Sequence, residues 1–259
     1  MATTTRRVDT ADLEHRVKSM YTDVALTPEL EFHFETGRSL AEHLGYPAAD
    51  LDRIPAAAIA SFAGVGYFLD LANIQPGETV LDLGSGSGTD SLLAATATGP
   101  TGRVIGVDMT HAQLDKARRL AEDAGLTNSE FREGYIEHPP VDDRSVDCVI
   151  SNGVINLAAD KPAVFRAAAR ALRPGGRLAI ADIVTAVQLR EGVTGDASLW
   201  AACIGGAAQR DDYLDTITAA GFVIETVREN DYRFRSDRAL GATTTYGVTS
   251  ISLLARQSR

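Results

Sequence analysis

The feature with the clearest chemical meaning is a glycine-rich turn that directly follows a run of apolar residues. Residues 80–88 read VLDLGSGSG, an apolar strand pattern that ends in alternating glycine and serine. Glycine lets the backbone turn tightly and approach a ligand closely, and the start of the following helix offers free N–H groups. The segment therefore predicts a nucleotide-like ligand at the end of a strand, in contact with Gly84, Ser85 and Gly86.

The spacing of the glycines narrows the class of ligand. A dinucleotide fingerprint has the spacing G-x-G-x-x-G, but the sixth position counted from Gly84 is Thr89. The spacing present is G-x-G-x-G, and Asp82 precedes it. S-adenosylmethionine is cationic overall and has no pyrophosphate, so an acid at the end of the strand suits it. The sequence therefore favours S-adenosylmethionine over NAD, with Asp82 among its contacts.

The second strand pattern ends in an acid that can hold a ribose. The carboxylate of Asp108 can accept both ribose hydroxyls, and Met109 offers an apolar side chain for one face of an adenine. The residues expected at the other adenine edge follow the third strand pattern: Gly134, Ile136 and Glu137. The alternatives are a solvated acid at Asp108, a core residue at Met109 and an exposed turn at the last three positions.

Four residues are candidates for the acceptor side of the site. His33, between two phenylalanines, is the best candidate for a general base, although a packed helix with one polar contact explains it as well. Asn152 and Asn156 follow the fourth strand pattern, where open α/β sheets bind ligands, and Asn152 is also expected to contact the cofactor; loop capping explains both equally. Cys203 follows Trp200 by three residues, so a helix puts both on one face, lining the acceptor pocket or packing.

Alternating strand and helix patterns predict a parallel sheet built from βαβ units. The predicted strands are 79–83, 103–108, 129–133, 146–151, 177–184, 222–228 and 248–255. The predicted helices that accompany them are 89–98, 111–124, 161–172 and 212–220, with a turn at 173–176. Thr110 and Gln113 have the spacing of a capping box at the start of the second of these helices.

The chain divides into three regions by pattern. Residues 1–74 have apolar residues at helical spacing, interrupted by prolines, and are expected to form a helical cap over the site. Residues 75–185 are the expected core that binds the cofactor. Residues 186–259 are expected to cover the substrate and to supply the strands that complete the sheet.

Composition argues against several classes of function. The formal net charge of −10 disfavours nucleic acid and anionic lipid as partners, and the first residues lack the apolar run of a signal peptide or membrane anchor. The two cysteines, Cys148 and Cys203, form no disulfide or zinc pattern, which agrees with a cytoplasmic location. We therefore expect a small-molecule partner and no metal site, and the oligomeric state stays open.

Four segments resemble the arsenite methyltransferases, a family of class I S-adenosylmethionine-dependent methyltransferases. They read LDLGSGSG at 81–88, GVDMT at 106–110, SNGVINL at 151–157 and LWAACIGGA at 199–207. The resemblance implies a doubly wound, Rossmann-like sheet of seven strands, one of them antiparallel. It also implies that S-adenosylmethionine contacts Asp82, Gly84, Gly86, Asp108, Met109, Gln113 and the region of Ile136.

Two departures from this family bear on the substrate. Members that methylate arsenic carry a cysteine where Gly153 stands and another in the N-terminal region, where this chain has none. Only Cys203 matches, and one thiolate holds a soft trivalent ion weakly, while Cys148 is expected to be buried in a strand. We therefore expect methyl transfer to a small metabolite, with arsenite bound through Cys203 as the alternative. An NAD(P)-linked oxidoreductase and a noncatalytic module that binds S-adenosylmethionine are more remote alternatives.

Overall fold

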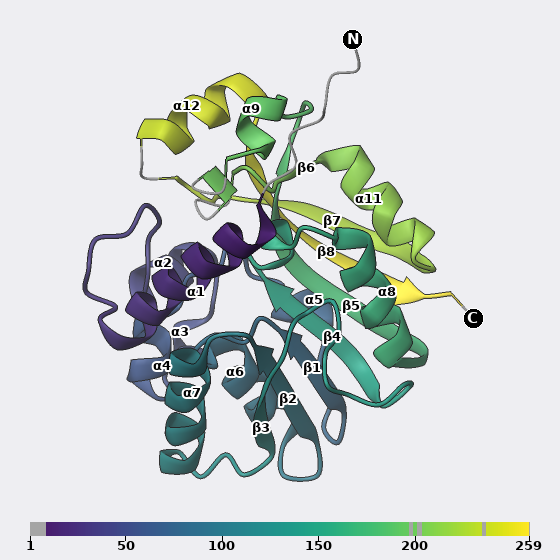
Figure 1. The fold of residues 1–259 in the computed structure, drawn as a ribbon. Coiled ribbons are helices and arrows are strands. Elements are labelled where there is room, and N and C mark those ends of the chain that lie inside the picture. Colours follow the sequence, from purple (N-terminus) through teal and green to yellow (C-terminus); the bar gives the residue numbers. More distant parts are fainter. Residues whose placement is uncertain (1–8, 197–198, 201–203, 235–236, 259) are drawn as a thin grey trace.

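The computed structural model describes residues 9–196, 199–200, 204–234 and 237–258, and its sheet is covered by helices on both faces (Figure 1). The strand order is β3-β2-β1-β4-β5-β8-β7, with β6 paired to β5. β8 runs antiparallel to β5 and β7, and the other pairs are parallel. This is the doubly wound sheet with one antiparallel strand that the family resemblance implies, and the two-residue strand β6 is an addition. The strands are β1 (Thr79–Leu83), β2 (Arg103–Asp108), β3 (Ser129–Glu133), β4 (Val146–Asn152), β5 (Leu172–Thr185), β6 (Ala208–Gln209), β7 (Phe222–Asn230) and β8 (Thr249–Gln257).

The core lies on both faces of the central strands. Leu81 of β1 belongs to the apolar cluster that includes Phe165 of α8 and Tyr213 of α11. Its neighbour Val80 belongs to a second cluster, with Ala94 of α6. Successive residues of a strand point to opposite faces, so a strand buried on both sides is mostly apolar. The helices that follow β1 are α6 (Thr89–Thr98), α7 (His111–Asp123), the 3-10 helix η1 (Ile155–Leu157), α8 (Lys161–Ala171), α9 (Glu191–Thr194), α11 (Arg210–Ala219) and α12 (Asp237–Tyr246).

The order of strands reverses at β1, which lies between β2 and β4. Asp82 of β1 is in register with Gly106 of β2 and with Ile150 of β4. In open α/β sheets ligands bind outside the carboxyl ends of the strands at such a switch point. The topology therefore brings the ends of β1, β2 and β4 to one edge, where the candidate residues of all three gather.

The segment before β1 is helical, as its apolar spacing predicts. Its helices are α1 (Thr10–Leu26), α2 (Arg38–His43), α3 (Ala48–Leu51), α4 (Ala56–Ala60) and α5 (Leu69–Ala72). Pro47 and Pro55 directly precede α3 and α4, because proline is tolerated at the start of a helix but breaks its interior. α1 crosses the carboxyl end of the sheet (Figure 1). No helix among the residues described is both long and apolar enough to span a membrane.

Two local predictions are wrong. Thr110 precedes α7, but its side chain makes no capping hydrogen bond. The N–H of Thr110 donates to Oδ1 of Asp108, and the side chain of Gln113 bonds Ser87 and Tyr21, so neither half of a capping box forms. Strand β5 begins at Leu172, earlier than predicted, because the expected turn is a bulge within it. The pairing of β4 with β5 shifts from Val146 and Leu172 to Cys148 and Arg177, so residues 173–176 lie outside the regular ladder.

Candidate active site

Two adjoining cavities lie at the carboxyl ends of β1, β2 and β4. The larger, which we name the Met109 cavity, has a volume of about 280 Å³ and is lined by α1, by the ends of β2 and β3 and by the segment after β4. The smaller, which we name the Asp82 cavity, has a volume of about 60 Å³ and is lined by the glycine-rich turn and the start of α6. Tyr21, Gly84 and Val154 line both cavities, which therefore meet at these three residues.

Each residue predicted to hold the cofactor lines one of these cavities. The Met109 cavity is lined by Gly84, Asp108, Met109, Gly134, Ile136 and Glu137. The Asp82 cavity is lined by Asp82, Gly84, Ser85, Gly86, Gln113 and Asn152. Candidates from five parts of the sequence thus come together because parallel strands end at the same edge of the sheet.

The glycine-rich turn is held tightly against the neighbouring strand. Gly84 has a φ of 79°, and a Cβ atom there would lie 2.4 Å from Cγ2 of Val154, so a larger residue does not fit. The N–H of Gly84 donates to the carbonyl oxygen of Val107 over 2.8 Å. The N–H of Gly86 donates to Oδ2 of Asp108 over 2.9 Å. The backbone of the turn therefore forms a fixed wall where the two cavities meet.

Asp82 is a buried acid whose charged form is disfavoured in this structure. Its side chain is 2% exposed, and Oδ2 accepts a 2.6 Å hydrogen bond from the hydroxyl of Ser91. Burial, reinforced by the nearby charge of Asp90, raises the pKa of Asp82 to about 8. A cation in the Asp82 cavity would therefore be attracted by this carboxylate and would restore its ionised form.

Asp108 is held by the backbone on both sides of its carboxylate. Oδ1 accepts from the N–H of Thr110 over 2.8 Å, and Oδ2 accepts from Gly86. Burial raises the pKa of Asp108, while these hydrogen bonds act in the opposite direction. The carboxylate is thus fixed at the wall of the Met109 cavity, where it remains able to accept hydrogen bonds from a ligand.

A buried network that the sequence analysis missed joins the N-terminal helices to the Asp82 cavity. The hydroxyl of Tyr46 donates to Oδ1 of Asp90 over 2.6 Å, and Nδ2 of Asn152 donates to Oδ2 of Asp90 over 3.0 Å. Oδ1 of Asn152 accepts from the N–H of Val65 over 2.8 Å. Burial raises the pKa of Asp90 to about 6, although both hydrogen bonds lower it. Asn152 therefore holds the N-terminal segment against the strand end besides lining the cavity.

Gln113 connects α1 to the glycine-rich turn instead of capping α7. Its Oε1 accepts a short hydrogen bond from the hydroxyl of Ser87, and its Nε2 donates to the carbonyl oxygen of Tyr21 over 2.9 Å. Two further bonds hold the last turn of α1: Lys116 donates to the carbonyl of Ala25, and Ser61 to that of Val24, each over 2.8 Å. These contacts fix the end of α1 over the site.

The candidates for the acceptor side are less closely gathered. His33 lies in the loop before α2, with its ring edge-on to Phe34 at 4.6 Å, and lines neither cavity. Asn156 is fully buried in η1 beside Asp182 and lines neither cavity. Cys203 lies outside the described residues. Trp200, its predicted neighbour, packs against α1.

The residues present fit a cationic cofactor with an adenine. In the described part of the chain, the buried hydroxyl of Ser85 has no hydrogen-bond partner, and it lines the Asp82 cavity, so a ligand can satisfy it there. Asp82 and Asp90 favour an ammonium or sulfonium group and would repel a pyrophosphate. Met109 and Ile136 give the larger cavity the apolar walls that an aromatic ring needs.

The doubly wound sheet and the acidic, glycine-walled site at its switch point define an α/β protein that binds a nucleotide-like cationic cofactor. A family model described as a methyltransferase domain matches residues 74–221. The chain belongs to this family, and S-adenosylmethionine is its cofactor.

Known relatives add detail to this assignment. The arsenite methyltransferase of Halobacterium salinarum is 44% identical over 197 residues, which are 76% of this chain and 50% of the relative. The arsenite methyltransferase of Homo sapiens is 39% identical over 137 residues, which are 49% of this chain and 36% of the relative. The chain thus spans about half or less of the length of these curated relatives.

Solved structures show the same fold. An arsenic(III) S-adenosylmethionine methyltransferase from Chlamydomonas reinhardtii has a TM-score of 0.63 and 28% identity, covering 86% of this chain and 74% of that one. A geranyl diphosphate C-methyltransferase from Streptomyces coelicolor has a TM-score of 0.65 at 17% identity, covering 95% and 97%. The resemblance inferred from the four sequence segments is therefore confirmed at the level of family and fold.

Proposed function

We propose that this protein transfers a methyl group from S-adenosylmethionine to a small-molecule acceptor. The observation that carries the proposal is the meeting of the Met109 and Asp82 cavities at Gly84, under α1. When bound, the cofactor supplies a methyl group activated by its sulfonium. The protein then has to position the donor and acceptor and exclude water, which accounts for much of the rate enhancement in such displacements.

Each cavity suits one end of the cofactor. Asp108 would accept the ribose hydroxyls, and Met109 and Ile136 would cover the adenine, because these three line the larger cavity. Asp82 and the hydroxyl of Ser85 would hold the amino-acid end in the smaller cavity, where the acid attracts its ammonium. This division follows from the polarity of the two sets of walls.

Helix α1 is the element that keeps water away. Leu13 and Val17 are buried and line the Met109 cavity, and Trp200 packs on the same two residues. Tyr21 of the same helix reaches the junction of the two cavities. A site roofed by apolar side chains on one helix favours transfer to a bound acceptor over hydrolysis.

Two acceptor classes are supported by different observations. The relatives named arsenite methyltransferase favour arsenite. The residues favour an acceptor that needs no thiol cage: Cys148 is buried, burial raises its pKa to about 12, and Gly153 faces the apolar Val65. Cys203 is the other cysteine of the sequence, so arsenite would have to be held through it. We therefore place a metabolite first and arsenite second.

One experiment separates these classes. Purified protein is incubated with methyl-labelled S-adenosylmethionine and either a metabolite extract or arsenite with glutathione, and labelled products are identified by mass spectrometry. We expect a labelled metabolite and little methylated arsenic. Efficient arsenic methylation that is lost in Cys203→Ser would establish arsenite as the acceptor. Absence of binding of both S-adenosylmethionine and S-adenosylhomocysteine to folded protein would overturn the proposed function.

A further inference from the structure

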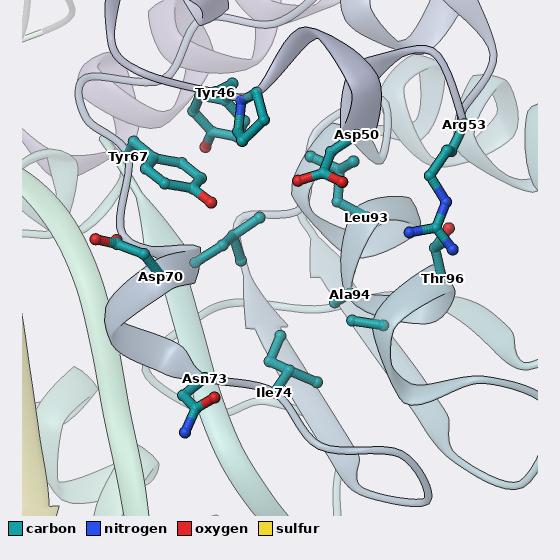
Figure 2. A pocket seen from close by; sticks show the side chains of 13 residues that line it. Tyr46, Asp50, Arg53, Tyr67, Asp70, Asn73, Ile74, Leu93, Ala94 and Thr96 are labelled. Carbon is teal, nitrogen blue, oxygen red and sulfur yellow. The ribbon is translucent and has the colours of Figure 1, made fainter.

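A third cavity, of about 250 Å³, lies between α3, α5 and α6, away from the site described above (Figure 2). It shares no lining residue with the Met109 or Asp82 cavity among the residues described. Its volume is close to that of the Met109 cavity and below the roughly 300 Å³ at which sites for drug-sized ligands begin. It is therefore large enough for a small metabolite and is not required by the proposed reaction.

Two opposite charges in this cavity have no partner. Asp50 and Arg53 both line it, and neither has an oppositely charged group within 4.0 Å anywhere in the described chain. Nearby charges are paired: Asp52 contacts Arg38 at 2.8 Å, and Asp70 contacts Arg228 at 2.8 Å. Asp50 and Arg53 are thus the charges that remain available to a ligand.

The two charged groups lie at different places in the cavity. In Figure 2 the carboxylate of Asp50 is directed toward the side of the cavity that holds Tyr67, and the guanidinium of Arg53 lies on the opposite side of the view. Burial raises the pKa of Tyr67 most, and the charges of Asp70 and then Asp50 raise it further. A hydrogen-bond donor with a positive charge fits between Asp50 and Tyr67, and an anionic acceptor fits beside Arg53.

The rest of the wall combines apolar and polar side chains. Leu69, Ile74, Leu93 and Ala94 supply apolar surface, and Asp70, Asn73 and Thr96 supply polar groups. The ring of Tyr67 packs edge-on against the ring of Tyr46 at 4.8 Å and closes one end. A ligand here therefore needs a short apolar body between its charged ends.

We propose that this cavity binds a small zwitterion of the amino-acid type, with an ammonium group at Asp50 and Tyr67 and a carboxylate at Arg53. A simple amine would leave Arg53 without a partner, and a simple carboxylate would leave Asp50 without one. Asp50 is half-buried and Arg53 is exposed, so water solvates both in the free protein. A molecule with both charges can pair with both groups at once. Arginine matches a carboxylate with its paired N–H donors, so each end of the ligand has a defined place.

Three probes with the same apolar body test the charges separately: leucine, leucinamide, which is a cation, and 4-methylpentanoate, which is an anion. Their binding to the full chain is measured by calorimetry with S-adenosylhomocysteine in excess, so that the cofactor site is filled. We expect leucine to bind at least roughly tenfold more tightly than either analogue, since each loses one charge-assisted contact. Equal binding of the three probes, or no binding of any, overturns the proposal.

Single substitutions test which residue binds the ammonium group of the ligand and which binds its carboxylate. Asp50→Asn should abolish the preference for leucine over 4-methylpentanoate, and Arg53→Gln should abolish the preference for leucine over leucinamide. Asp52→Asn is the control, because Asp52 lies in the same turn but pairs with Arg38 outside the cavity. Loss of leucine binding in Asp52→Asn equal to that in Asp50→Asn overturns the proposal. The two charge variants report independently, so failure of one to fold leaves the other as a test.

Discussion

The hydroxyl of Tyr46 lies 2.6 Å from Oδ1 of Asp90 and joins the N-terminal helices to the first turn of α6. Both side chains are buried, and the same hydroxyl accepts a 3.0 Å hydrogen bond from Nδ2 of Asn152. Asp90, which lines the Asp82 cavity, is thereby held in place by Tyr46, a residue far from it in the sequence. The contact makes the cofactor site depend on the correct docking of the N-terminal segment.

Tyr46→Phe removes this hydroxyl and leaves the buried Asp90 with fewer donors. We expect the free energy of unfolding to fall by about 1 to 3 kcal/mol, because an unsatisfied buried acceptor bears its full desolvation cost. Urea denaturation measures this change. Tyr67→Phe is the control, since Tyr67 packs on the same ring but its hydroxyl donates no hydrogen bond in the described structure. Equal effects of the two substitutions would show that packing dominates.

Asp108→Ala should weaken the binding of S-adenosylhomocysteine by about 1.5 to 3 kcal/mol, because charge-assisted hydrogen bonds to the ribose are lost. Isothermal titration calorimetry measures the affinity. Glu133→Ala is a matched control, because Glu133 ends the neighbouring strand β3 but lines neither cavity. Unchanged affinity in Asp108→Ala would show that the carboxylate bonds the backbone of Gly86 and Thr110 without a role in binding.

Cofactor binding should release a proton at neutral pH. The pKa of Asp82 is about 8 in the structure without ligand, so the group is mostly protonated at pH 7 and ionises beside a cation. Calorimetry in two buffers with different ionisation enthalpies detects the proton. Asp82→Asn should remove the proton release and also weaken binding. A binding enthalpy independent of the buffer in the unsubstituted protein would contradict the assignment.

The same shift predicts how stability depends on pH without cofactor. The folded-state pKa of Asp82 is raised from 3.8 to about 8, so between these values the folded state holds a proton that the unfolded state has lost. Its contribution to stability is therefore present below about pH 4 and is lost as the pH rises toward 8. We therefore expect the free energy of unfolding of the unsubstituted protein, minus that of Asp82→Asn, to fall as the pH rises from about 4 to about 8. A difference that is constant with pH would show that Asp82 is not perturbed.

Gln113→Ala should loosen α1, because Ser87 and the carbonyl of Tyr21 both lose their partner. We expect faster amide hydrogen exchange in the second half of α1 and a loss of about 1 to 3 kcal/mol in stability. Mass spectrometry of exchanged peptides locates the change. Gln75→Ala is the control, since its side chain bonds only locally to Asn73. Exchange that increases equally along the whole chain would argue against a local role.

The fold was largely predictable from the sequence, because the spacing of apolar residues along a strand or helix follows which of its faces are buried. Strands β1, β2 and β3 have the predicted bounds, since each is a short run that ends at a turn signal. The convergence of Asp82 and Asp108 was also predictable, because parallel strands end at one edge. Strand β5 was placed too late because glycine and proline at 173–176 signal a turn but lie in a bulge.

The parts of the site that could not be predicted depend on contacts between distant segments. Nothing local in the sequence pairs Tyr46 with Asp90. The spacing of Thr110 and Gln113 favours a capping box, but Oε1 of Gln113 accepts from Ser87 and the N–H of Thr110 donates to Asp108 instead. His33 was chosen for its aromatic neighbours, but those rings stack on one another outside both cavities. The sequence neighbours of a residue therefore predicted its place in the site less well than its position at the end of a strand did.

The two ends of α1 are held to the rest of the protein by different contacts. Side chains of Ser61, Gln113 and Lys116 donate to carbonyl oxygens in its last two turns. Nearer its N-terminal end the helix is held by the packing of Leu13 and Val17 on Trp200 and by a hydrogen bond from the exposed Tyr135 to Glu14. Hydrogen bonds to the rest of the protein are thus concentrated at the C-terminal end of the helix, and we expect opening to begin at its N-terminal end. Opening that begins there would uncover the Met109 cavity before the Asp82 cavity. The adenine end of the cofactor would then be first to leave and last to be enclosed.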